Sequence, residues 1–170
     1  MGYTHYFEYN SVGKKHPHKD DGSTNPYLPD DGRWEALIEF AKFAIRDRRG
    51  KASETAGAYY DDEVVDVAWK RGPDWFMVDS NEGSGETFYF TRWGSEDAMD
   101  LFVKTNRLPY DILVVAIIHA ALEVRLLHKF HSDGTPQELR QGIELYYRLC
   151  DDFRKKHSRD WWDTDHLKPE

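Results

Sequence analysis

Residues 109–122 read PYDILVVAIIHAAL, the longest apolar run in the chain. Proline suits the first position of a helix, and Asp111 adds negative charge to the first turn, where the helix dipole favours it. From Ile112 to Leu122 the run is apolar on every side, which predicts a helix buried on more than one face. A membrane-spanning helix needs roughly 18 apolar residues. The run is shorter, so we expect it inside a folded domain.

Strand and helix patterns lie on both sides of this segment. Residues 3–9 read YTHYFEY and predict a first strand, because aromatic and β-branched residues favour strands. Strict alternation would place Tyr3, His5, Phe7 and Tyr9 on one face of that strand. Further strands are predicted at 64–69, 75–79, 87–93 and 126–131, helices at 31–49 and from Pro136 through Cys150, and a short helical turn within 95–105.

The order of these elements indicates the fold class. Without the short strand at 64–69 the core reads βαββαβ, the ferredoxin-like pattern of an antiparallel sheet with helices packed on one face. A C-terminal helix is added to that α+β core. We expect one domain over residues 1–156 and a tail over 157–170. Trp161 and Trp162 in the tail are expected to dock back onto the domain or to bind a partner.

Composition narrows the possible partners. The 170 residues carry a net charge of −8, and residues 61–100 hold eleven acidic and three basic side chains. An acidic surface repels phosphate backbones, so binding of duplex nucleic acid is disfavoured. The single cysteine, Cys150, suits a reducing compartment. With no signal-like N-terminus and no membrane segment, we expect a cytoplasmic protein.

Four blocks of sequence carry a resemblance. They are MGYTHYF at 1–7, GETF at 85–88, FVKTNRLPYD at 102–111 and SDG at 132–134. In this order they resemble a family of small bacteriophage-encoded proteins that begin MGYTHY. That family has Trp at the position of Phe7 and Cys at the position of Val103, so cysteine chemistry is not expected there. The resemblance implies a phage or prophage origin, host cytosol as the place of action and one compact domain, and no particular chemistry.

Three groups of polar residues form a candidate ligand site: one on the first strand, one just before the apolar helix and one in the turn before the last helix. Helix starts favour anions, lysine adds a cation, and short hydroxyl and glycine turns donate hydrogen bonds. Together they predict a pocket for a phosphate-bearing or nucleotide-like ligand. The candidate residues are Tyr3, His5, Tyr6, Lys104, Thr105, Ser132, Asp133 and Gly134. The competing interpretation is ordinary helix-start and turn chemistry, with strand aromatics in the core.

Three functions follow from these patterns. The first is a non-enzymatic accessory protein that binds a small anionic ligand or a host protein. The second is a phosphate-ester hydrolase with His5 as general acid or base, Asp111 or Asp133 orienting it, and Lys104 on the developing charge. The third is a purely protein-binding module that uses the acidic segment 61–100 or the tail with Trp161 and Trp162. The first two predict that His5, Lys104 and Ser132 meet in one cleft.

Metal and cofactor sites are not expected. His16 and His18 flank a proline before two aspartates, but no third anchored ligand is evident. The chain has no P-loop, no dinucleotide-binding fingerprint and no Gly-x-Ser-x-Gly motif. His119 lies in the apolar run and is expected to be a core histidine whose ring nitrogens are satisfied.

Overall fold

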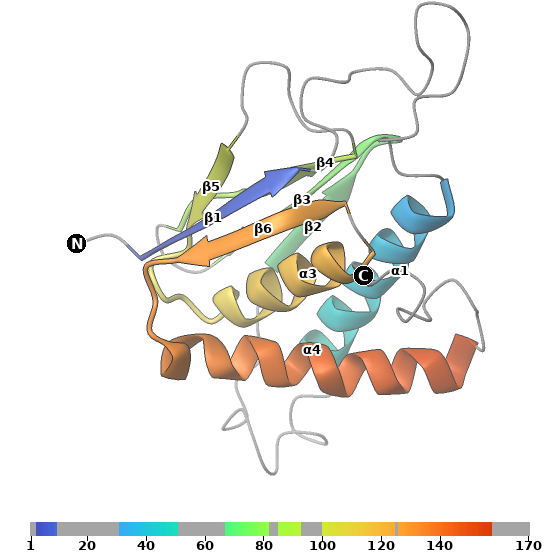
Figure 1. Cartoon of the computed structure of the whole chain (residues 1–170). Coiled ribbons are helices and arrows are strands. Elements are labelled where there is room, and N and C mark those ends of the chain that lie inside the picture. Colours follow the sequence, from blue (N-terminus) through green and yellow to red (C-terminus); the bar gives the residue numbers. More distant parts are fainter. Residues whose placement is uncertain are drawn as a thin grey trace, which may run out of the picture.

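The computed structural model describes residues 3–9, 31–50, 67–81, 85–92, 100–124 and 126–157 (Figure 1). Structural statements below concern these residues. In chain order the elements are β1 (Thr4–Tyr9), α1 (Asp31–Gly50), β2 (Val67–Arg71), β3 (Trp75–Ser80), β4 (Phe88–Thr91), β5 (Asp100–Lys104), α3 (Asp111–Glu123), β6 (Leu127–Ser132) and α4 (Pro136–His157).

The strands form two antiparallel sheets of three strands each. One has the order β5-β1-β6 and the other the order β2-β3-β4. In the first sheet β1 is central, and His5 lies opposite Val103 on one side and Ser132 on the other. Helices α3 and α4 run side by side, with α3 nearer the first sheet (Figure 1). Strands β5 and β6, which precede and follow α3 in the chain, therefore lie on the two sides of β1.

Aromatic rings between the two sheets fill the core. Phe7 on β1 lies 5.8 Å from the Phe88 ring and 6.2 Å from the Phe90 ring, both on β4. Trp34 of α1 stacks on Phe90 at 6.3 Å. Tyr3, His5, Phe7 and Tyr9 are all buried. The alternation predicted for these four side chains is therefore confirmed, while on the other face Tyr6 is exposed, Glu8 is half-buried and Thr4 is buried.

Helix α3 is buried on nearly every side, as its composition predicts. Ten of its thirteen residues are buried. Helix α4 packs closely on it at Gly142, where an added Cβ would lie 2.5 Å from the Cβ of Val115. Arg148 of α4 donates two hydrogen bonds to Asp47 of α1, at 3.3 and 2.8 Å. The three helices thus pack on one another.

The α+β class is confirmed, and the finer topology differs from expectation. Residues 100–104 form strand β5 on the edge of β1, where a helical turn within 95–105 was expected. Because β5 occupies that edge, β4 pairs with β3 in a separate sheet. The single sheet of a ferredoxin-like fold is therefore not confirmed.

Three further expectations concern the strand at 64–69, membrane-spanning helices and the tail. The strand expected at 64–69 lies instead at Val67–Arg71, where it pairs with β3. No helix in the described ranges is long and apolar enough to cross a membrane. The expected docking of the tail at 157–170 falls outside the described residues.

Candidate functional site

A buried carboxylate at the start of α3 collects three hydrogen bonds. The Tyr3 hydroxyl donates to Asp111 Oδ2 at 3.1 Å, and the Thr105 hydroxyl donates to Oδ1 at 2.6 Å. His5 Nε2 lies 2.5 Å from the same Oδ1. His5 and Thr105 are fully buried. Hydrogen bonds to the Asp111 carboxylate therefore link β1, the turn after β5 and the first turn of α3.

The second nitrogen of His5 extends this network to β6. A carboxylate can only accept hydrogen bonds, so His5 Nε2 is the donor in its pair with the Asp111 carboxylate. His5 Nδ1 then accepts from the Ser132 hydroxyl, with the two atoms 2.9 Å apart. The Gly134 amide donates to Ser132 Oγ at 2.9 Å. Ser132, His5 and Asp111 thus form a continuous hydrogen-bonded array.

Close packing explains the glycine in this turn. A Cβ added at Gly134 would lie 2.5 Å from the Tyr3 ring. Burial and the nearby Asp111 carboxylate raise the pKa of the Tyr3 hydroxyl, so it remains a neutral donor. The turn after β6 therefore seats directly against the aromatic ring that begins β1.

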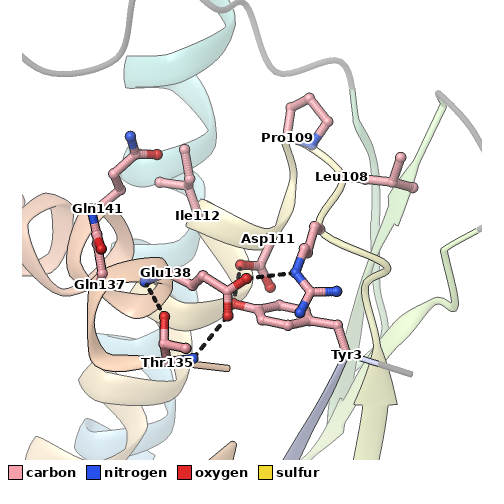
Figure 2. A pocket seen from close by; sticks show the side chains of 10 residues that line it. Tyr3, Leu108, Pro109, Asp111, Ile112, Thr135, Gln137, Glu138 and Gln141 are labelled. Carbon is pink, nitrogen blue, oxygen red and sulfur yellow. Dashed lines mark hydrogen bonds and ion pairs between the residues drawn. The ribbon is translucent and has the colours of Figure 1, made fainter. Parts of the chain in front are cut away.

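A pocket of about 620 Å³ opens beside this network, where α3 and α4 both begin (Figure 2). The Tyr3 ring and Asp111 form its floor, and polar side chains of α4 form one wall. Its lining residues are Tyr3, Arg107, Leu108, Pro109, Asp111, Ile112, Thr135, Gln137, Glu138 and Gln141. The helix dipoles of α3 and α4 both direct their positive ends to this region.

Arg107 extends over the pocket and is held in two ways. Its Cζ lies 4.5 Å from the centre of the Tyr3 ring, in cation–π contact. Its Nε donates to Glu138 Oε1 at 2.7 Å. This hydrogen bond lowers the pKa of Glu138, and the same bond raises the pKa of Arg107.

Glu138 is itself fixed by the start of α4. The Thr135 amide donates to Glu138 Oε2 at 2.8 Å, and the Glu138 amide donates to Thr135 Oγ1 at 3.2 Å. This reciprocal pair is a capping box, which satisfies two amides at the helix start. The carboxylate that holds Arg107 is therefore a rigid part of α4.

The backbone that carries Arg107 is strained. Asn106 and Arg107 have φ angles of 53° and 58°, in the left-handed region that favours glycine. The Leu108 amide closes the turn on the Thr105 carbonyl at 3.1 Å. Two consecutive non-glycine residues in this region are uncommon, and such strain is often associated with function. The turn directs the Arg107 side chain over the pocket.

The residues predicted from sequence separate into two groups. Tyr3, His5, Thr105, Ser132 and Gly134 meet in the buried network. Tyr6 and Lys104 lie on the opposite face of the first sheet, where both are exposed. Asp133 is also exposed, with its amide bound to the Thr4 carbonyl. His5 and Ser132 therefore meet, as predicted. The prediction that Lys104 joins them is wrong, because strand alternation directs its side chain to the face opposite that of Val103 and Thr105.

Sequence reasoning missed Arg107 and Glu138. Both carried a signal: Arg107 lies in the block FVKTNRLPYD, and Thr135-x-x-Glu138 is a capping-box pattern. Among the described residues no group of three or more His, Cys, Asp or Glu side chains is placed to hold a metal ion. His16 and His18 lie outside those residues.

Comparisons of the chain with protein-family models, with curated proteins and with solved structures find no match.

Proposed function

We propose that this protein is a phage-type, non-enzymatic accessory protein that binds a small phosphate-bearing ligand in the pocket at the starts of α3 and α4. The observation that carries the proposal is the placement of Arg107. Within the described part of the chain, only its Nε makes a hydrogen bond, to Glu138. The two terminal amino groups are left for a ligand, and their fork matches two oxygens of a phosphate.

The surroundings of Arg107 suit a nucleotide-like ligand. The Tyr3 ring lies beneath the guanidinium, is buried and donates its hydroxyl to Asp111, so it holds Arg107 over the pocket rather than contacting the ligand itself. Gln137 and Gln141 on the α4 wall carry amide donors. The two carboxylates of the pocket already accept hydrogen bonds, Asp111 from three donors and Glu138 from Arg107 and Thr135. A ligand anion therefore meets one cation with unused donors rather than two bare carboxylates.

A thermal-shift and calorimetric titration tests the proposal. The probes are nucleoside monophosphates, nucleoside triphosphates, cyclic nucleotides and inorganic phosphate, since a ligand that binds only the folded protein raises its Tm. We expect at least one of these to raise the Tm of the wild-type chain, and Arg107→Ala to abolish that shift. Arg107→Lys should weaken it, because an ammonium lacks the planar fork.

The matched control is Arg140→Ala. Arg140 also lies on the surface and pairs with Glu144 at 3.2 Å, one turn along α4, but it does not line the pocket. Loss of binding in both arginine variants would mean that the general charge of the protein matters, and the pocket would not be the site. No shift with any probe at millimolar concentration would refute the proposal.

A phosphate-ester hydrolase is the second candidate, and the array of Ser132, His5 and Asp111 favours it. In that function Ser132 Oγ attacks phosphorus while His5 Nδ1 takes its proton and passes it to the ester oxygen that leaves, and Asp111 orients the ring. Water, deprotonated by His5, then hydrolyses the phosphoserine to restore Ser132 and release phosphate. His5 is fully buried, so a substrate has access only to the partly exposed Ser132. Turnover of p-nitrophenyl phosphate that Ser132→Ala abolishes would support the hydrolase.

The other hypotheses stay predictions. Binding of a host protein through residues 61–100 rests on the acidic charge of that segment, much of which lies outside the described residues. A ferredoxin-like relationship rests on the order β6-β1-β5, which is the order that these strands would have in such a sheet.

A further inference from the structure

The outer face of the sheet β5-β1-β6 carries a row of exposed rings. Phe102, Tyr6 and His131 lie side by side on the three strands, with ring centres 6.4 Å and 5.9 Å apart. Phe102 is 55% exposed and Tyr6 is 38% exposed. Large apolar rings grouped on one exposed face are typical of a binding surface. This face points away from the buried network around Asp111.

The face has a projection on one side of β1 and a hollow on the other. Phe102 on β5 is more exposed than Tyr6 on β1 and projects from the face. Between β1 and β6 lies a hollow of about 420 Å³. It is lined by Tyr6, Phe7, Glu8, Lys129, Phe130 and His131. The projection and the hollow are therefore separated by the central strand.

The charged side chains on this face also differ between the β5 side and the β6 side of β1. Lys104 lies opposite Thr4 on the β5 side. Asp133 lies beside Thr4 on the β6 side, with its amide 3.0 Å from the Thr4 carbonyl. Both side chains are exposed. A cation and an anion thus flank the same residue of β1.

We infer that this face binds a second copy of the same chain through a two-fold axis that runs parallel to β1 between the two sheets. Such an axis exchanges the β5 side with the β6 side. It places Phe102 of each copy over the hollow of the other, and it places Lys104 of each copy near Asp133 of the other. The same axis therefore gives complementary shapes and complementary charges across the interface. An isologous interface requires this, because both copies use the same face.

The charge pattern favours a second copy over single-stranded nucleic acid. Aromatic rows on sheets do stack nucleic-acid bases, but they are combined with a basic groove. Here Glu8 and Asp133 offset Lys104 and Lys129, and the whole chain carries a net charge of −8. Three strands about 4.8 Å apart make a face only about 15 Å wide. We therefore expect a weak, concentration-dependent dimer, since small interfaces are the weak ones.

Sedimentation velocity of the full chain over micromolar to millimolar concentrations tests the inference. The wild type is expected to shift from monomer to dimer. Lys104→Asp and Asp133→Lys should each weaken dimerisation by about tenfold or more, because like charges then meet across the axis. The double variant should recover it, because the exchanged charges meet again. Tyr147→Ser, a change at an exposed ring on α4, is the control and should dimerise normally.

Circular dichroism of each variant shows whether the fold is retained. A wild type that stays monomeric throughout would overturn the inference, and so would single variants that dimerise as the wild type does. A double variant that fails to recover would also overturn it. If the monomer binds single-stranded oligonucleotides and Phe102→Ser removes that binding, the face belongs to nucleic acid instead. The outcome does not depend on Arg107, so the ligand proposal stands or fails separately.

Discussion

Replacing Thr105 by Val tests whether the Asp111 network holds the fold together. The Thr105 hydroxyl is fully buried and donates to Asp111 Oδ1 at 2.6 Å. A hydrogen bond to a charged group contributes about 1.5–3 kcal/mol. Valine has nearly the same shape and leaves no cavity, and its extra buried methyl returns about 0.8 kcal/mol. We expect the variant to lose about 1–2 kcal/mol of unfolding free energy.

Urea denaturation measures this loss directly. The midpoint should fall while the m-value stays unchanged, and the Tm should drop by about 2–8 °C for a chain of this size. Tyr3→Phe removes a second donor to the same carboxylate, so the two effects should not add. Thr87→Val is the matched control, because Thr87 is exposed. If Thr105→Val changes the midpoint no more than Thr87→Val does, Asp111 is not the anchor of the fold.

Three further changes have definite expected results. Arg107→Gly should abolish ligand binding in calorimetry while the Tm stays equal or rises, because glycine adopts the left-handed φ at this position without strain; a lower Tm would contradict the strained turn. Burial, with a smaller effect from the electrostatic interaction with His5, lowers the pKa of His119 below 6.5, so below that pH the unfolded chain binds a proton that the folded chain does not. Stability should therefore fall as the pH drops from about 6.5, and His119→Phe should flatten that fall in urea midpoints measured against pH. Gly142→Ala should destabilise the protein by about 1–2 kcal/mol, because overpacking against Val115 outweighs the gain of about 1 kcal/mol in helix propensity; an unchanged urea midpoint would mean that α3 and α4 separate easily.

His119 also shows where a local interpretation stops. Its position in an apolar helix predicts a core histidine, and its ring does pack on Phe130 at 5.5 Å and Tyr146 at 6.0 Å. Its Nε2, however, makes no hydrogen bond to any described residue. Periodicity indicates that a side chain is buried, but it carries no information about which polar atoms come within reach.

Strand β5 was missed for a related reason. Residues 100–104 read DLFVK, which is too short and too mixed to stand out by propensity. The segment is a strand because its backbone pairs with β1 over five residues, from Thr4 opposite Lys104 to Glu8 opposite Asp100. Once it pairs, alternation alone sets the side chains: Val103 faces the core, while Phe102 and Lys104 face solvent.

The residue pattern alone was enough for the α+β class, the two faces of β1, the all-round burial of α3 and the start of α4 at Pro136. Propensity, alternation and capping act over a few residues, so they can be recognised in a single sequence. The network at Asp111 depends on long-range contacts, since His5 lies 106 residues from Asp111 and 127 residues from Ser132. The tertiary structure also directs Lys104 away from that network and places Arg107 over the pocket. Packing of distant segments sets which polar groups meet, because hydrogen bonds and ion pairs form only between atoms that the completed core brings within about 3 Å.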